Sequence, residues 1–206
     1  GLRAVLEAIE IGRIYASFHV DSGADIDSEV SLDRCHDEIV WDWDGVRFEF
    51  LNLEPPAAAS DNDRSCVLRV SSTQRSALLS GDIGATVERR LVRAGISSAD
   101  LLFAPHHGSR TSSSARWIQA TRPSWVVVSA PRRSRYGHPH PDVVNRYLDL
   151  NARVVITGYA GALVWRSWQS DVLEQWRRRR RAYWLNPPFG WPATAHPAAE
   201  SSSATD

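Results

Sequence analysis

Short apolar and strand-like runs, separated by polar and turn-forming residues, recur through the first half of the chain. These runs predict strands over residues 13–17, 38–43, 46–53, 65–70 and 76–80. Asp44 and Gly45 separate two of these strands, and an Asp-Gly pair is a strong signal for a two-residue hairpin turn. A short helix is predicted before the first strand, because apolar residues follow helical spacing from Leu2 to Ile9.

Helices and strands alternate in the second half of the chain. Helices are predicted over residues 85–94, 113–120 and 141–150, and strands over residues 100–104, 125–129, 154–157 and 162–165. Strands first and alternating elements later indicate an α/β (α+β) fold in which helices flank sheets. The remaining segments are an acidic, irregular stretch over residues 19–37, a predicted Arg-rich helix over residues 169–185 and a predicted disordered tail over residues 186–206.

The length and composition are those of one globular domain, with 206 residues of which 43% are hydrophobic. The printed sequence shows no run of roughly 18 apolar residues, which a membrane helix requires, and no export signal at its start. It contains no methionine and opens at Gly1. We therefore expect it to be a piece of a longer polypeptide.

The charges are unevenly distributed along the chain. All 24 basic residues are arginine, and they balance 24 acidic residues overall. Residues 1–60 contain 4 Arg and 13 Asp or Glu, whereas residues 110–181 contain 14 Arg and 4 acidic residues. Guanidinium groups suit bidentate contact with phosphate, so the basic half suits a polyanion. The alternative is that these arginines only solvate the surface.

The chain has two cysteines, Cys35 and Cys66. Two thiolates are too few for a tetrahedral thiolate metal site, so the cysteines are either two buried thiols or one disulfide. A reducing compartment favours the thiols, and an oxidising compartment favours the disulfide.

Residues able to bind metal follow three successive predicted strands. Asp82 lies in a Gly-Asp turn after the first, His106 and His107 follow the second, and His138 follows the third. Imidazole is a common ligand of divalent metals and a carboxylate can bridge two of them, so this pattern predicts a dinuclear hydrolytic site. The alternatives are a helix cap for Asp82 and structural roles for the histidines, while His138 is also a candidate general acid.

Polar and basic residues accompany these positions. Ser109 opens a run of Ser and Thr that either caps the next helix or donates hydrogen bonds to a substrate phosphate. The candidates for phosphate contact by guanidinium are Arg110, Arg132, Arg133 and Arg135. For His140, which lies between two prolines, a structural role is favoured.

Together these segments resemble the metallo-β-lactamase-like domain at the C-terminal end of the ComEC family of DNA-internalisation competence proteins. Five motifs occur in the order of that family: Asp63-Arg-Ser-Cys-Val-Leu-Arg-Val, Leu-Leu-Ser-Gly-Asp82-Ile, Pro105-His-His-Gly-Ser-Arg-Thr-Ser-Ser, Tyr136-Gly-His-Pro-His and Thr157-Gly-Tyr-Ala-Gly-Ala. The resemblance covers residues 1–165, and the Arg-rich segment after them resembles the end of proteobacterial members.

The resemblance implies an αββα metallo-β-lactamase-like sandwich over residues 1–168, truncated at its N-terminus. It also implies that the intact domain hydrolyses phosphodiesters of incoming DNA with two divalent metal ions, Mn²⁺ or Zn²⁺. Asp82 would be the bridging carboxylate, the His106-His107 pair would supply a ligand, with His107 favoured, and His138 would be a further ligand or a proton donor. Metallo-β-lactamase folds also carry an upstream His-x-His-x-Asp-His motif, which the printed sequence lacks. We therefore expect the chain alone to bind metal weakly and not to cleave DNA.

The resemblance also implies a location and partners. The parent protein would lie in the bacterial inner membrane, with this domain on the periplasmic side, beside the membrane channel of the same chain. Its partner would be DNA in single-stranded form. An oxidising location makes a Cys35–Cys66 disulfide the expected state. Two alternatives remain, a non-catalytic module that guides DNA or assists assembly, and a metallohydrolase of another substrate such as a lactam or a small phosphoester.

Overall fold

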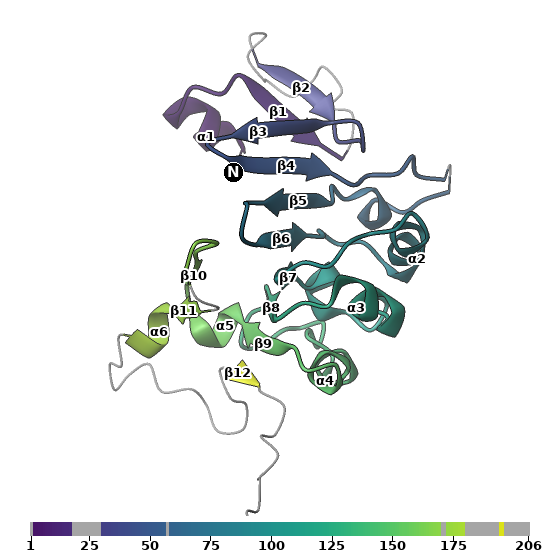
Figure 1. The fold of residues 1–206 in the computed structure, drawn as a ribbon, viewed down its shortest axis with the longest axis vertical. Helices are drawn as coiled ribbons and strands as arrows, with labels where there is room; N and C mark the ends of the chain where they lie inside the picture. Colours follow the sequence, from purple (N-terminus) through teal and green to yellow (C-terminus); the bar gives the residue numbers. More distant parts are fainter. Residues whose placement is uncertain (1, 18–29, 57, 170–171, 180–193, 196–206) are drawn as a thin grey trace, which may run out of the picture.

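The computed structural model describes residues 2–17, 30–56, 58–169, 172–179 and 194–195 of the chain. Its main feature is a mixed sheet of eight strands (Figure 1). In sheet order these are β12 (Thr194–Ala195), β9 (Arg153–Ile156), β8 (Trp125–Val128), β7 (Leu101–Phe103), β6 (Ser76–Leu79), β5 (Leu68–Ser71), β4 (Val46–Phe50) and β3 (Val40–Trp43). Strands β6 to β9 pair in parallel, whereas β3 to β6 pair antiparallel and β12 adds an antiparallel edge.

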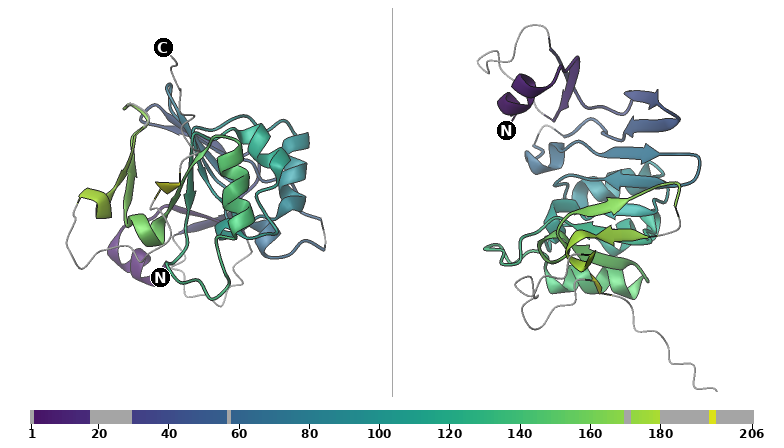
Figure 2. Two further views of the ribbon diagram at one scale, coloured as in Figure 1. Left: turned by 90° about the horizontal axis from the view of Figure 1, so that it is seen from below. Right: turned by 90° about the vertical axis from the view of Figure 1, so that its left-hand side faces the viewer.

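Three helices cover one face of this sheet, as Figure 2 shows: α2 (Ala85–Arg93), α3 (Ala115–Thr121) and α4 (Pro141–Asp149). The main core lies between the helices and the sheet. Leu78, Leu102 and Val126 from neighbouring strands are fully buried there with Trp117 of α3 and Tyr147 of α4. Burying a large apolar side chain stabilises a fold by about 1.5–3 kcal/mol, so this core fixes the ends of the parallel strands firmly in place.

A smaller layer lies across the opposite face of the sheet. It contains α5 (Thr157–Ala160) and the antiparallel pair of β10 (Leu163–Trp165) and β11 (Leu173–Gln175). Ala160 and Leu173 of this layer pack against Trp125 and Val155 of the main sheet. The central strands are therefore covered on both faces.

The N-terminal segment lies beyond β3, at the top of Figure 1. It comprises α1 (Leu2–Ala8), β1 (Arg13–Ala16) and β2 (Ser31–Arg34), and its two strands pair in parallel. A disulfide joins Cys35, just after β2, to Cys66, just before β5. The bridge ties this segment to the main sheet.

The α/β fold and most of the predicted elements are found. Asp44 and Gly45 have φ angles of 49° and 75°, which are the left-handed values that a two-residue hairpin turn requires. Strand β2 was missed, because it lies in the acidic segment that was predicted to be irregular.

The C-terminal part differs from the predictions. The helix expected over residues 169–185 is found only as α6 (Trp176–Arg179), because residues 173–175 form β11, where Leu173 and Gln175 are buried. Residues 180–185 lie outside the described residues. In the predicted tail, Thr194–Ala195 pair with β9, and the rest of residues 186–206 also lies outside the described part. Among the residues described, no helix is long and apolar enough to cross a membrane.

Candidate functional site

The loops that leave the carboxyl ends of three parallel strands carry the candidate residues. Asp82 follows β6, the short 3-10 helix Pro105–Gly108 follows β7, and His138 lies in the loop between β8 and α4. In parallel sheets, ligand sites form at this edge because successive loops converge there. The candidate residues therefore come together at the carboxyl edge of the parallel strands.

Asp82 and His107 face each other across the loops after β6 and β7. Oδ1 of Asp82 lies 3.4 Å from Nε2 of His107. Nδ1 of His107 lies 2.8 Å from the carbonyl oxygen of Ser129, which can only accept, so Nδ1 carries a proton. Nε2 is therefore the ring nitrogen that faces Oδ1, in a position from which both atoms could bind one metal ion. Metal-ligating histidines typically have such a carbonyl or carboxylate behind them.

The backbone of the histidine pair is left-handed. His106 and His107 have φ angles of 51° and 56°, a region that non-glycine residues enter at an energetic cost. A hydrogen bond of 3.0 Å from the His106 amide to the Gly81 carbonyl holds this conformation. Gly108 is equally constrained, since a Cβ there would lie 2.8 Å from Cβ of Pro139. Backbone strain of this kind concentrates at functional sites.

His106 and His138 form a second group beside the Asp82–His107 pair. Their rings lie edge to face with 5.8 Å between centroids, and Nε2 of His106 lies 3.3 Å from the side-chain nitrogen of Asn62. Burial, and then the neighbouring imidazoles, lower the pKa of His138. The lowered pKa favours the neutral form of His138, which can bind a metal or accept a proton and must gain a proton before it can act as an acid.

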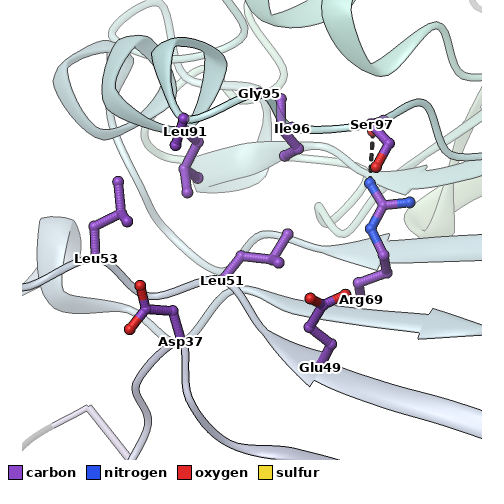
Figure 3. Close-up of a pocket in the computed structure, with 10 residues that line it drawn as sticks. Asp37, Glu49, Leu51, Leu53, Arg69, Leu91, Gly95, Ile96 and Ser97 are labelled. Atoms are coloured by element: carbon purple, nitrogen blue, oxygen red, sulfur yellow. Dashed lines mark hydrogen bonds between the residues drawn. The ribbon is translucent and has the colours of Figure 1, made fainter.

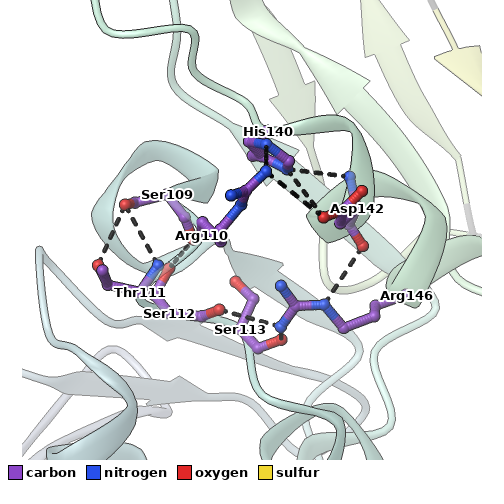
Figure 4. Close-up of polar contacts among 8 residues, drawn as sticks. All are labelled: Ser109, Arg110, Thr111, Ser112, Ser113, His140, Asp142 and Arg146. Atoms are coloured by element: carbon purple, nitrogen blue, oxygen red, sulfur yellow. Dashed lines mark hydrogen bonds and ion pairs between the residues drawn. The ribbon is translucent and has the colours of Figure 1, made fainter.

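A buried carboxylate holds the loop that follows the histidine pair. Glu88 of α2 is fully buried, and its oxygens accept hydrogen bonds from the amides of Ser113 and Ser114, the second at 2.9 Å. Arg146 of α4 donates to the Ser113 carbonyl (Figure 4), and the hydroxyl of Tyr147 donates to Oγ of Ser113 at 2.9 Å. Burial outweighs these hydrogen bonds and raises the pKa of Glu88.

His140 has the structural role that the sequence favours. It precedes α4, and its Nδ1 accepts a hydrogen bond of 3.2 Å from the Asp142 amide. Its Nε2 lies 2.5 Å from the guanidinium of Arg110, which also lies 3.8 Å from the Asp142 carboxylate (Figure 4). Both ring nitrogens of His140 are thus engaged within the protein.

Three of the predicted phosphate-contact residues already have partners. Ser109 is 7% exposed, and its hydroxyl lies 3.1 Å from that of Thr111. Arg110 is engaged with His140, as described above. The guanidinium of Arg132 donates to the Gly158 carbonyl at 3.0 Å. These three side chains stabilise the loops around the site.

Arg133 and Arg135, the other two predicted phosphate contacts, are exposed and line a cavity of about 410 Å³. His107 and His138 line the same cavity, and so does Tyr136, whose ring is 67% exposed. A cationic and partly apolar cavity thus opens directly beside the Asp82–His107 pair.

A different cavity of about 250 Å³ lies between the C-terminal end of α2 and the sheet (Figure 3). Leu51, Leu91 and Ile96 form apolar walls, and Arg69 lies at one side. Burial lowers the pKa of Arg69, whose guanidinium is held by the carbonyl of Ser97 at 2.5 Å and by that of the next residue. The lining of this cavity includes none of the sequence-predicted site residues.

Asp63 was not predicted as a site residue, although it belongs to the first motif of the resemblance. It lies in the 3-10 helix Asn62–Arg64, and its Oδ1 accepts a hydrogen bond of 3.1 Å from the Gly84 amide. Gly84, and not Asp82, is the N-cap residue of α2, and within the described residues no side chain caps that helix. The alternative role of Asp82 as a helix cap is therefore not observed.

The metal centre implied by the resemblance fits the described residues in part. Asp82 and His107 present an oxygen and a nitrogen 3.4 Å apart, which matches two ligands of one tetrahedral zinc ion with bonds of about 2.0–2.2 Å. In the described part of the chain, no group of three or more His, Cys, Asp or Glu side chains is placed to hold a metal ion. Asp82 and His107 could therefore hold two positions of a metal centre, which the described residues alone do not complete.

Comparison with known proteins finds relatives among competence proteins. The chain is 36% identical over 151 residues to Competence protein ComA of Neisseria gonorrhoeae, covering 72% of this chain and 22% of that protein. It is 30% identical over 150 residues to Recombination protein 2 of Haemophilus influenzae, covering 73% of this chain and 19% of that protein. It is 32% identical over 122 residues to ComE operon protein 3 of Bacillus subtilis, covering 59% of this chain and 16% of that protein. The chain thus spans about a fifth of the length of these curated relatives.

No family model matches the chain. Among solved structures it is similar to the metallo-β-lactamase fold protein YhfI of Bacillus subtilis, with a TM-score of 0.43 and 12% identity over 70% of this chain and 61% of that one.

The mixed sheet with its flanking helices, and the Asp and His residues at its carboxyl edge, agree with the metallo-β-lactamase-like fold that the sequence resemblance implies. More particularly, the chain is a ComEC-like metallo-β-lactamase domain, related to competence proteins.

Proposed function

We propose that this domain supplies part of the metal-dependent phosphodiesterase site of a DNA-uptake protein. The observation that carries the proposal is the Asp82–His107 pair, in which two acceptors face each other at 3.4 Å while the Ser129 carbonyl fixes the imidazole from behind. Asp82 and His107 would each donate one ligand to a divalent metal. When bound, that metal would lower the pKa of a water molecule and offset the charge of the scissile phosphate.

Residues of this chain would orient the substrate and move the proton. Neutral His138, on the wall of the cavity shared with His107, would accept a proton from water and could return it to the leaving oxygen. Arg133 and Arg135 would hold phosphates along the same cavity without reading the bases.

Incoming DNA is the substrate that the relatives support. They are named competence and recombination proteins, and the basic second half of this chain suits a polyanion. The Cys35–Cys66 disulfide supports an oxidising location, which for a membrane-associated parent would be the extracytoplasmic side.

The test is a cleavage assay with a protein that joins this domain to a segment carrying the His-x-His-x-Asp-His motif. With Mn²⁺ and labelled single-stranded DNA, we expect cleavage that Asp82→Asn and His107→Ala abolish together with bound metal. His36→Ala is the control, because His36 is an exposed histidine paired with Glu38 and separate from the site. Metal retained by Asp82→Asn with normal cleavage would contradict the proposal.

His138→Ala separates the two roles open to that residue. Loss of metal would make His138 a ligand. Retained metal with cleavage slowed about 10²–10⁴-fold would make it the group that moves the proton.

A second function, a non-catalytic module that guides DNA, is favoured by one observation: the described residues supply only two positions of a metal centre. Metal stoichiometry decides between the two functions. A joined protein that binds DNA tightly but holds no metal would be the guiding module.

A further inference from the structure

An exposed aromatic ring lies beside the candidate site. Tyr136 is 67% exposed, and it lines the cavity of about 410 Å³ together with His107 and His138. The rings of Tyr136 and His138 lie 6.0 Å apart. Ala130 and Pro131 add apolar surface to the same cavity. Exposed aromatic surface in a cavity of this size is a feature of ligand-binding sites.

Hydrogen bonds hold the backbone of the loop that carries Tyr136. Oγ of Ser134 accepts hydrogen bonds from the amides of Tyr136 at 3.3 Å and of His138 at 3.1 Å. The Ser134 carbonyl accepts a third hydrogen bond, from the Gly137 amide at 3.1 Å. Because the loop is already ordered, a ligand that stacks on the ring loses little of its binding energy to ordering.

Two arginines accompany the ring in this cavity. The guanidinium of Arg135 lies over the Tyr136 ring at 4.6 Å from its centroid and contacts the hydroxyl of Tyr136. Arg133 is exposed on the lining of the same cavity. An aromatic face next to guanidinium groups matches one nucleotide, since the base offers a flat π-face and the phosphate offers negative charge.

We propose that the cavity beside Tyr136 is a subsite for one unstacked base of single-stranded DNA, next to the phosphate at the Asp82–His107 pair. This inference rests on the proposed function and specifies its substrate. A base in a duplex must leave its stack and its partner before it reaches the cavity, whereas a single strand pays little of this cost. The subsite therefore selects single strands without selecting a sequence, because every base has a π-face.

The experiment measures binding of the 206-residue chain to fluorescein-labelled oligothymidylate by anisotropy, with EDTA present to prevent cleavage. The same assay uses a strand of equal length that carries abasic sugars, and a duplex. Stacking of one base on an aromatic ring is worth about 1–3 kcal/mol, so Tyr136→Ala should weaken binding to oligothymidylate by about 5- to 150-fold. It should leave binding to the abasic strand unchanged, and Tyr136→Phe should keep the affinity of the original chain.

Trp43→Ala is the matched control, because Trp43 is 66% exposed but lies on β3, four strands away from β7. Equal affinity of the original chain and Tyr136→Ala for oligothymidylate, or an equal loss on intact and abasic strands, would overturn the subsite. If either of these results occurs while the chain still binds DNA in a salt-dependent way, the subsite fails but the proposed function stands. Failure of the original chain to bind any of the three DNA probes would overturn both.

Discussion

At the scale of single residues, the site depends on positions that only glycine fills without strain. Gly108 has φ +76°, and a Cβ there would lie 2.8 Å from Pro139, so it sets how closely the histidine loop approaches the loop of His138. Gly45 has nearly the same φ, +75°, but nothing lies within 4 Å of a Cβ added to it. The two glycines therefore have nearly the same φ angle, but only Gly108 lies in close contact with another loop.

We predict that Gly45→Ala lowers the free energy of unfolding by about 1–2 kcal/mol, the cost of a side chain in the left-handed region. Gly108→Ala should cost about 1–3 kcal/mol more, because it also overpacks the two loops. Urea unfolding of both variants measures the difference. Equal losses of stability would show that the loops do not pack as described.

The convergence of Asp82, His107 and His138 at one edge of the sheet was predictable from the sequence, but the local pattern did not specify which histidine faces Asp82. Asp82, His107 and His138 follow successive strands of one sheet, so their convergence follows from the parallel order of β6, β7 and β8. Which histidine faces Asp82 depends on the left-handed backbone at His106 and His107, and nothing in the local pattern specifies that conformation.

At the scale of elements, Glu88 joins helices that are distant in sequence. Its carboxylate binds the loop before α3, and Arg146 of α4 binds the same loop. These contacts span 26 and 33 residues, so helical periodicity could not indicate them. Local periodicity also failed at residues 173–175, where pairing with β10 decides the strand.

The pKa of Glu88 is raised in the folded state, so folding favours its protonated form. The stability that this group contributes is fully present below its unfolded pKa and is lost as the pH rises through its folded pKa. We predict that the stability of the unsubstituted chain relative to Glu88→Gln falls over this window, by about 1.4 kcal/mol for each unit of pKa difference. Chemical denaturation at a series of pH values tests this. If the difference in unfolding free energy between the unsubstituted chain and Glu88→Gln stays constant or grows as the pH rises, the burial of Glu88 described above would be contradicted.

The disulfide connects the N-terminal segment to the main sheet across 31 residues of sequence. In the chain-entropy model, closing a loop of this length stabilises the fold by about 3–4 kcal/mol. We predict a loss of about that size in the Cys35→Ser, Cys66→Ser double variant, measured by urea unfolding without reductant. Reductant should destabilise the original chain to the same extent and leave the double variant unchanged. An original chain that is insensitive to reductant would show that its cysteines are not bridged.

At the scale of the whole molecule, the sequence predicted the sign of the charge on the second half but not which arginines are available. Arg110 and Arg132 are held by His140 and by the Gly158 carbonyl, whereas Arg133 and Arg135 line the cavity beside the site. Of the four predicted arginine contacts, Arg133 and Arg135 are the two that line this cavity.

We predict that Arg133→Ala with Arg135→Ala weakens binding to single-stranded DNA and makes the slope of log K against log salt shallower by about 1.4, or 0.7 for each phosphate contact. Arg93→Ala is the control, because Arg93 is an exposed arginine at the far end of α2. An anisotropy titration at several salt concentrations gives the slopes. The same shift for Arg93→Ala would mean that only overall charge matters.

The central claim is that Asp82 and His107 present two ligands to one divalent cation. Metal binding by the 206-residue chain is its most direct test. Titration calorimetry with Zn²⁺ at pH 7 should show weak binding that is reduced at least about tenfold in Asp82→Asn and in His107→Ala. His36→Ala, which removes an exposed histidine elsewhere, should bind as the original chain does. Equal Zn²⁺ affinity in all four proteins would contradict the account, because Asp82 and His107 would then contribute nothing to Zn²⁺ binding.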